Sequence, residues 1–256
     1  MSVNGAPIGL LNDYQAAGDK KNGHIGVVLV HGFTGSPAAM RPWAEFLNAR
    51  GYSVRVPLLP GHGTLPADLN QVKWQQWPEK VAGEIAELRK SCSQIFVAGL
   101  SMGGGTTLNI AASQGDQISG IILVNPMIHV RFVSPKLAFV ISRVVKFGKS
   151  VGNDIKRKGV TEYSYDKLPH RGIYQLLTML KLTRAALPNI KVPLQLFHSV
   201  DDHTLPVSNT EIVMREISSI SKSRIELLNS YHVATIDYDA DLIFTNSLTF
   251  IESLSK

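Results

Sequence analysis

The chain has 256 residues, of which 44% are hydrophobic and 18% are charged. A chain of this length forms one large or two small domains, and this composition supplies a sizeable core. It therefore excludes a disordered protein, a collagen and a small disulfide-built scaffold. The 26 Lys and Arg residues against 20 Asp and Glu residues give a net charge of +6. Because these basic residues are scattered, they predict a solvated surface and no nucleic-acid partner.

Neither the cysteine content nor the N-terminal segment indicates a secreted protein. Cys92 is the only cysteine, which excludes an intrachain disulfide and disfavours a zinc site built on cysteines. The first residues lack the basic start, apolar stretch and small-residue cleavage site of a signal peptide. No apolar run reaches the roughly 18 residues that a transmembrane helix needs. Together these features predict a cytoplasmic globular protein.

Short apolar runs alternate with helical patterns along most of the chain. Predicted strands cover Ile25–Val30, Ser53–Leu58, Ile95–Ala98, Gly120–Val124, Pro193–His198 and Arg224–Leu228. Predicted helices cover Ala38–Arg50, Pro78–Ser91, Gly103–Gln114, Val207–Ser219 and Asp239–Leu254. Most of the strands are continuous apolar runs, as expected when helices cover both faces of a sheet. This order predicts an α/β fold with a mostly parallel central sheet and helices on both sides.

The alternation breaks over residues 127–190. This stretch has no clear strand, is rich in basic residues and contains two helical patterns, Pro135–Phe147 and Gly172–Leu187. A long insertion between two strands is typical of a lid that shapes a binding site, although both helices could instead pack on the sheet like the others. We therefore expect a core formed by residues 1–126 and 191–256, and a cap formed by residues 127–190.

The clearest chemical signal is Gly99-Leu100-Ser101-Met102-Gly103, a G-x-S-x-G motif. It lies between the predicted strand Ile95–Ala98 and the helical pattern that follows, which is the context of a nucleophile elbow. Such a sharp turn holds the serine in a strained conformation, and the flanking glycines leave room for it. We expect Ser101 to project above the sheet as a nucleophile, at the positive end of a helix.

A serine nucleophile needs a general base and an acid that orients the base. In a fold with this elbow, the acid and then the histidine follow the serine along the chain. His232 fits the base because it follows the last predicted strand. The acid is either Asp202 or Asp201, since both follow the strand Pro193–His198. The D-x-x-x-P spacing to Pro206 favours Asp202, but sequence alone does not separate adjacent loop residues.

An acyl-transfer serine also needs hydrogen-bond donors for the developing oxyanion. The N–H of Met102, directly after the nucleophile, is one candidate, and the N–H of Phe33, in the loop His31–Gly35 after the first predicted strand, is the other. We interpret His31 as a brace for this loop. His62 has no ligand partners at metal-binding spacing. The chain also lacks a phosphate-binding G-x-x-x-x-G-K-[ST] motif and a G-x-G-x-x-G motif after the first strand.

Four stretches together resemble the α/β-hydrolase superfamily and, more narrowly, the small bacterial carboxylesterases and monoacylglycerol lipases. They are His31-Gly32-Phe33-Thr34-Gly35-Ser36-Pro37, Leu59-Pro60-Gly61-His62-Gly63-Thr64, Gly99-Leu100-Ser101-Met102-Gly103-Gly104 and Ser230-Tyr231-His232-Val233-Ala234-Thr235-Ile236-Asp237. The segment Ser199–Pro206 is similar as well, and its register supports Asp202 as the acid. The resemblance implies an α/β-hydrolase fold in which the insertion caps an acyl pocket. It also implies an oxyanion hole formed by Phe33 and Met102, and no metal or organic cofactor.

By this resemblance we expect hydrolysis of short or medium acyl esters or monoacylglycerols through an acyl-enzyme on Ser101. The same triad would serve a thioester, a peptide or an activated amide, because fold and nucleophile do not define the leaving group. A non-catalytic binding protein on this scaffold is a further alternative, disfavoured because every triad member has a candidate. The basic, amphipathic helix of the insertion suggests weak contact with a membrane surface, although such helices commonly pack within a protein.

Overall fold

A computed structural model describes residues 5–19, 21–130, 135–150 and 152–255. Its centre is a seven-stranded sheet in the order β1-β3-β2-β4-β5-β8-β9. The strands of this sheet are β1 (Tyr14–Ala16), β2 (Ile25–Val30), β3 (Ser53–Val56), β4 (Gln94–Leu100), β5 (Gly120–Val124), β8 (Leu194–Ser199) and β9 (Lys222–Leu227). Strand β1 pairs antiparallel with β3, whereas every other pair in the sheet is parallel. The expected mostly parallel sheet is therefore confirmed.

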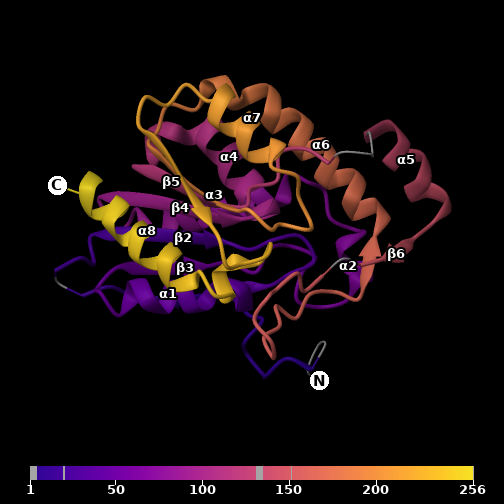
Figure 1. The fold of residues 1–256 in the computed structure, drawn as a ribbon, viewed down its shortest axis with the longest axis horizontal. Coiled ribbons are helices and arrows are strands. Elements are labelled where there is room, and N and C mark those ends of the chain that lie inside the picture. Colours follow the sequence, from indigo (N-terminus) through magenta and orange to yellow (C-terminus); the bar gives the residue numbers. More distant parts are fainter. Residues whose placement is uncertain (1–4, 20, 131–134, 151, 256) are drawn as a thin grey trace.

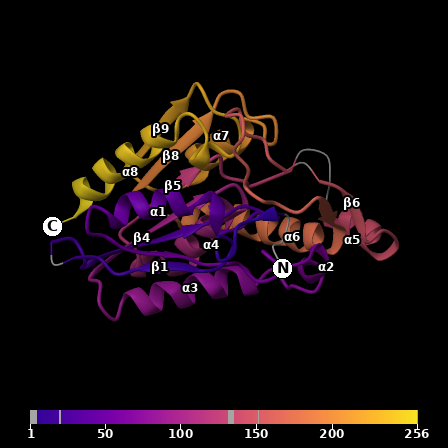
Figure 2. The same cartoon turned by 90° about the horizontal axis from the view of Figure 1, so that it is seen from below.

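Helices cover both faces of this sheet, as Figures 1 and 2 show from two directions. They are α1 (Arg41–Asn48), α2 (Pro66–Leu69), α3 (Gln76–Leu88), α4 (Met102–Gln114), α5 (Pro135–Val144), α6 (His170–Ala186), α7 (Ser208–Glu216) and α8 (Ala240–Leu254). On one face α1 and α8 pack through Trp43 and Phe244, whose rings stack with centroids 6.0 Å apart. On the other face α3, α4, α6 and α7 bury their apolar side chains in a second cluster. Because both faces are covered, strand β2 is buried along its whole length, which explains its unbroken apolar sequence.

The six predicted strands all exist; two have the predicted bounds, and the ends of the other four differ from the prediction by at most two residues. Strand β1 and helix α2 were not predicted, because three or four residues are too few to show a period. The helix expected over Ala38–Arg50 is in fact a 3₁₀ turn at Pro37–Ala39 followed by α1. Pro42 lies in the first turn of α1, where a missing N–H costs nothing.

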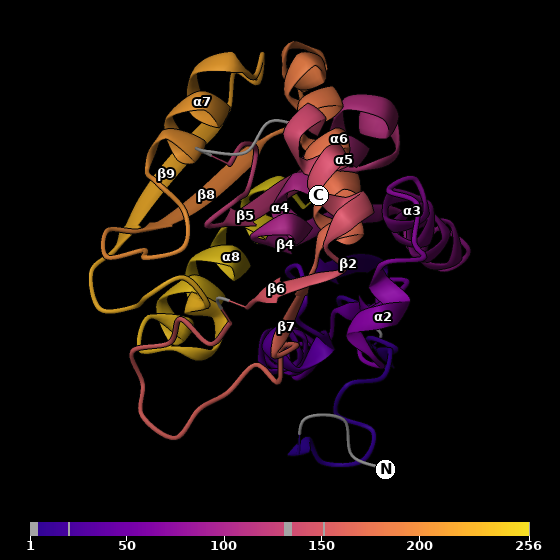
Figure 3. The same ribbon diagram turned by 90° about the vertical axis from the view of Figure 1, so that its right-hand side faces the viewer.

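Residues 127–190 lie between β5 and β8 and are called the insertion below; its residues 131–134 and 151 are outside the described part of the chain. The prediction that the insertion has no strand is wrong. It contains an antiparallel pair, β6 (Phe147–Lys149) and β7 (Lys167–Pro169), and Figure 3 shows this pair and α5 outside the main sheet. Helix α5 therefore ends at Val144, earlier than predicted, and it packs against α6. In the described ranges, no helix is long and apolar enough to cross a membrane.

Candidate active site

Ser101 lies at the sharp turn between β4 and α4, in the strained backbone conformation expected for a nucleophile elbow. Its φ is 56° and its ψ is −119°, a sparsely populated region that costs a non-glycine residue about 1–3 kcal/mol. The Ser101 N–H donates to the Val124 carbonyl over 3.1 Å, and the Ser101 carbonyl accepts from the N–H groups of Met127 and Gly105. Bonds to the end of β5 and to the first turn of α4 therefore hold the serine in this conformation.

Two glycines leave the space that this turn needs. A Cβ at Gly103 would lie 2.1 Å from the carbonyl oxygen of Val30, and a Cβ at Gly99 would lie 2.4 Å from the carbonyl oxygen of Gly103. Both distances are far shorter than van der Waals contact, so any side chain would force α4 away from β2 or β4. The two outer positions of the motif are thus glycine for a steric reason.

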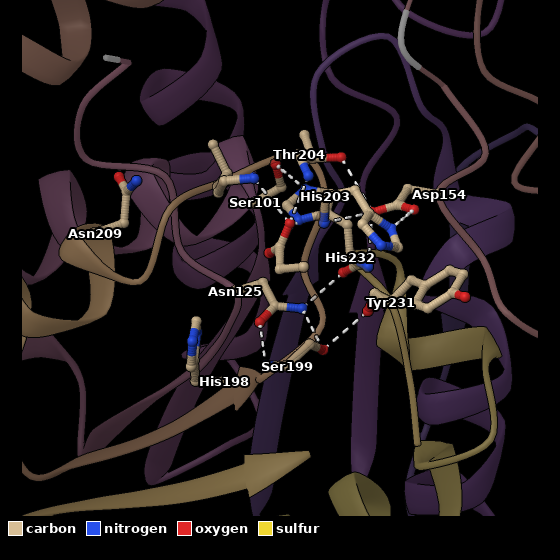
Figure 4. Close-up of polar contacts among 12 residues, drawn as sticks. Ser101, Asn125, Asp154, His198, Ser199, His203, Thr204, Asn209, Tyr231 and His232 are labelled. Atoms are coloured by element: carbon tan, nitrogen blue, oxygen red, sulfur yellow. Dashed lines mark hydrogen bonds and ion pairs between the residues drawn. The ribbon is translucent and has the colours of Figure 1, made fainter. Parts of the chain in front are cut away.

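Three of the predicted residues, Ser101, His232 and Asp202, form one chain of hydrogen bonds. Figure 4 shows Ser101 and His232 side by side. The Ser101 hydroxyl lies 2.9 Å from His232 Nε2, and His232 Nδ1 lies 2.8 Å from Asp202 Oδ2. The other carboxylate oxygen, Asp202 Oδ1, accepts from the N–H groups of Thr204 and Leu205. The neighbouring Asp201 is exposed. With Nδ1–H donating to the carboxylate, His232 Nε2 is left to accept the serine proton.

Burial and nearby carboxylates act in opposite directions on His232. Burial alone would lower the pKa of the imidazole, but the hydrogen bond and charge of Asp202, together with the charges of Glu162 and Asp154, raise it above 6.5. Burial would likewise raise the pKa of Asp202, but its bond to His232 and to two loop N–H groups lowers it. The His232 and Asp202 side chains are only 8% and 2% exposed. A proton taken up by His232 is therefore stabilised by a buried carboxylate.

The two expected oxyanion donors both border the serine. Met102 is the first residue of α4, where a backbone N–H has no acceptor within the helix. Phe33 follows Gly32, and a Cβ at Gly32 would lie only 3.3 Å from the Ser101 Cβ, so this turn runs against the serine. Phe33 and Ser101 also line the same pocket. The structure thus brings together all five residues that were predicted for the site.

Two buried histidines support the turn at Phe33. His31 Nδ1–H donates to the Gly32 carbonyl over 2.9 Å, and His31 Nε2 accepts from the Leu59 N–H over 3.1 Å. The His31 ring lies 5.0 Å from that of His62, which in turn packs edge-on against Phe33. Burial lowers the pKa of His31 to about 4 and lowers the pKa of His62 well below its ordinary value. Both rings are therefore neutral near pH 7, and His31 braces the loop by donating and accepting at once.

Ser101 and His232 line a pocket of about 130 Å³. The insertion contributes Gly152, Glu162 and Leu168 to its wall. Glu162 was not predicted; it is 8% exposed, and burial raises the pKa of its carboxyl group. It lies in an irregular part of the insertion, where no sequence pattern marks it. Across the described residues, no group of three or more His, Cys, Asp or Glu side chains could hold a metal ion.

Asn125 joins the ends of two strands to the loop that carries His232 (Figure 4). Its Nδ2 donates to the His232 carbonyl over 2.8 Å and to Ser199 Oγ over 2.9 Å, and its Oδ1 accepts from the Ser199 N–H over 2.8 Å. Ser199 Oγ in turn donates to the Tyr231 carbonyl over 2.8 Å. Asn125 was not predicted, although its place directly after the predicted strand Gly120–Val124 is a signal that could have found it.

Comparison with known proteins places the chain in a family. Residues 23–239 match the family described as serine aminopeptidase, S33. The chain belongs to this hydrolase family. It is 39% identical over 230 residues to a thermostable monoacylglycerol lipase of Bacillus sp. (strain H-257), a match that covers 90% of this chain and 91% of the relative. It is 26% identical over 235 residues to a carboxylesterase of Bacillus subtilis (strain 168), with 91% and 95% covered.

Solved structures agree with this family. One, from work on the metagenome-derived lipolytic enzymes LipS and LipT, matches with a TM-score of 0.89 and 34% identity over 97% of this chain and 100% of that chain. The monoacylglycerol lipase of Paleococcus ferrophilus matches with a TM-score of 0.78 over 96% and 99%; at 18% identity this likeness shows the fold alone. The α/β-hydrolase fold is confirmed, and the chain is an enzyme similar to carboxylesterases and monoacylglycerol lipases.

Replacing His31 by Gln is expected to reduce the acid sensitivity of the fold. Because the pKa of His31 is about 4 in the folded chain and 6.5 ordinarily, only the unfolded chain takes up this proton as the pH falls through that window. Between pH 7 and pH 4 the wild type should lose about 3 kcal/mol of unfolding free energy that His31→Gln keeps. Denaturant unfolding at both pH values measures the difference, with the exposed His24→Gln as control. Equal losses in wild type and His31→Gln would contradict it.

Proposed function

We propose that the chain is a serine hydrolase that cleaves carboxylic esters of short or medium acyl chain, monoacylglycerols included, through an acyl-enzyme on Ser101. The observation that carries this proposal is the unbroken contact from the Ser101 hydroxyl to His232 and on to Asp202, over 2.9 and 2.8 Å. Ester hydrolysis is also the activity named for the relatives at 39% and 26% identity. A non-catalytic binding role is disfavoured because the triad is complete.

The proposed reaction begins with transfer of the serine proton. His232 Nε2 accepts this proton as Ser101 Oγ attacks the ester carbonyl carbon, and the N–H groups of Phe33 and Met102 stabilise the resulting oxyanion. The C–O bond to the alcohol then breaks, and the imidazolium gives its proton to the leaving alkoxide. Water attacks the acyl-enzyme in the same way, with His232 as base, which releases the acid and restores Ser101. The Asp202 carboxylate orients the ring and stabilises its charged form.

We propose that the insertion, residues 127–190, acts as a cap that limits the acyl chain. Gly152, Glu162 and Leu168 of the insertion share the pocket with Ser101 and His232. The pocket volume of about 130 Å³ is below the roughly 300–1,000 Å³ of sites for drug-sized ligands, which favours a short acyl chain. The buried Glu162 carboxyl offers an acceptor for hydroxyl groups, which suits an alcohol such as glycerol.

An amide substrate is the second candidate. The family description names an aminopeptidase, and the triad itself does not distinguish an ester from an amide or a thioester. Glu162, a carboxyl group in the pocket, could pair with a substrate ammonium as well as with a hydroxyl group. The relatives at 39% and 26% identity are named as ester hydrolases, which favours an ester substrate. Rates on matched ester, thioester and amide substrates distinguish these candidates.

The chain-length profile tests the substrate proposal. We expect kcat/KM on p-nitrophenyl esters to peak between acetate and octanoate, to fall about ten-fold or more toward palmitate, and to be accompanied by turnover of 1-monoacylglycerols. Leu168→Ala, which enlarges the pocket, should move the peak to longer acyl chains. Leu182→Ala is the control and should leave the peak in place, because Leu182 is 48% exposed on α6 and does not line the pocket. Inactivity on every ester together with turnover of a thioester or an amino-acid anilide would contradict the proposal.

We propose further that the insertion makes weak contact with an anionic membrane surface. Helix α5 exposes Val140 and Val144 by 59% and 82%, beside the exposed basic residues Lys136 and Arg143. The helix lies at the end of the molecule opposite the C-terminus, as Figures 1 and 2 both show. Apolar side chains flanked by cations suit the boundary between acyl chains and anionic headgroups. The cytoplasmic location inferred from the sequence stays a prediction.

Co-sedimentation with lipid vesicles tests this contact. The protein should bind phosphatidylglycerol vesicles more than phosphatidylcholine vesicles, and added salt should weaken the binding. The double variant Val140→Ser/Val144→Ser should reduce the bound fraction, because it removes apolar surface from α5. The control double variant Ile220→Ser/Leu228→Ser also removes exposed apolar surface, but from residues outside the insertion; these two side chains are 101% and 64% exposed. Equal binding by both double variants, or no binding by the wild type, would overturn the proposal.

A further inference from the structure

The side chain of Asp154, in the insertion, bonds to two loops of the site. One loop carries His232, and the other carries Asp202 and the next residue, His203; Figure 4 shows Asp154 beside His232 and His203. Its Oδ2 accepts from the backbone N–H of His203 over 3.1 Å and from the backbone N–H of His232 over 3.3 Å. Its Oδ1 lies 2.9 Å from His203 Nδ1, and its Oδ2 also lies 3.4 Å from Thr204 Oγ1. The side chain is only 14% exposed. One half-buried carboxylate therefore bonds to the backbone of the base residue and to that of the residue after the acid.

The backbone around Asp154 strengthens this connection. The Asp154 carbonyl accepts from the Val233 N–H over 3.1 Å, so the link to the histidine loop is made twice. The preceding Asn153 has a φ of 62°, and its Oδ1 accepts from the Glu162 N–H and from Thr161 Oγ1, each over 3.0 Å. These bonds close a loop of the insertion and hold Asp154 in place next to the triad.

The link matters because the triad is assembled from separate loops. Asp202 and His232 are 30 residues apart and follow different strands, β8 and β9. Moving either loop away would leave its backbone N–H without this acceptor, so shared bonds to one carboxylate resist relative movement of the two loops. A displacement of about 1 Å between reacting groups can cost about 100-fold in rate. The rate of proton transfer from Ser101 thus depends on how firmly these loops are held.

We propose that Asp154 is a positioning residue, which from the insertion holds the loops after β8 and β9 so that His232 stays between Ser101 and Asp202. The inference rests on the catalytic roles proposed above and goes beyond them by giving the insertion a part in turnover. Asp154 is not among the residues that line the pocket at Ser101. Its effect is therefore on kcat, whereas KM stays nearly unchanged.

The charge of Asp154 provides a second measurable effect. Three carboxylates, those of Asp202, Glu162 and Asp154, raise the pKa of His232. Removing one of them should lower this pKa, which shifts the acidic limb of the pH profile of kcat/KM to lower pH. A residue that only stabilised the fold would leave this limb where it is.

The experiment compares Asp154→Asn and Asp154→Glu with Asp166→Asn, a change of an exposed acid in the same insertion. For Asp154→Asn we expect kcat to fall about ten-fold or more, KM to stay within about two-fold, and the acidic limb to move to lower pH. Asp154→Glu keeps the charge but alters the bond geometry, so it should restore the acidic limb more completely than kcat. Asp166→Asn should match the wild type.

His203→Gln separates the backbone bonds of Asp154 from its bond to the His203 ring, and it should lower kcat by less than about two-fold. The proposal is overturned if kcat and the acidic limb of Asp154→Asn match the wild type. It is also overturned if kcat falls only in proportion to the folded fraction, as measured by circular dichroism, with the limb unmoved. Labelling of Ser101 by a fluorophosphonate is measured in parallel. A wild type that is not labelled would overturn the proposed function. A labelled wild type, together with an Asp154→Asn variant whose kcat and acidic limb are unchanged, would overturn the positioning role alone.

Discussion

Ser101 has a backbone conformation that non-glycine residues rarely adopt, and the contacts that assemble the site begin at this turn. A serine with a φ of 56° persists only where its surroundings leave no alternative. Here the end of β5 binds its backbone through Val124, and Gly103 brings α4 against the carbonyl of Val30. The turn therefore exists only when the parallel sheet and α4 are fully assembled. The assembled sheet places the Ser101 hydroxyl 2.9 Å from His232 Nε2.

Burial gives the histidines of this site opposite protonation properties. His31 is buried with both ring nitrogens bonded to backbone groups, and burial outweighs the charge of Asp13, so its pKa falls to about 4 and it remains a neutral brace for the turn at Phe33. His232 is equally enclosed, but Asp202 and the carboxylates of the insertion raise its pKa. The site thus combines a rigid, uncharged wall near the expected oxyanion with a base whose charged form is stabilised. Both properties are needed for acyl transfer near neutral pH.

Local pattern was sufficient to predict six of the seven strands of the central sheet, all but β1, and the turn that carries Ser101, because a strand, a glycine-flanked serine and a helix are adjacent in the chain. The choice between Asp201 and Asp202 needed coordinates, since adjacent loop residues share the same sequence context. In the insertion both predicted helices exist as α5 and α6, but the strands β6 and β7 were missed, because they have three residues each and show no period. Asp154 and Glu162 lie in irregular backbone there, and their importance comes from tertiary contacts alone.

Covalent labelling of the purified protein by a fluorophosphonate, with the adduct located by peptide mass spectrometry, tests whether Ser101 is the nucleophile. We expect one adduct, on the peptide that contains Ser101, and loss of ester hydrolysis in proportion to labelling. We also expect Asp202→Asn to slow labelling by orders of magnitude, whereas Asp201→Asn should leave it nearly unchanged. Ester hydrolysis that survives complete labelling, or that survives in Ser101→Ala, would show that Ser101 is not the nucleophile.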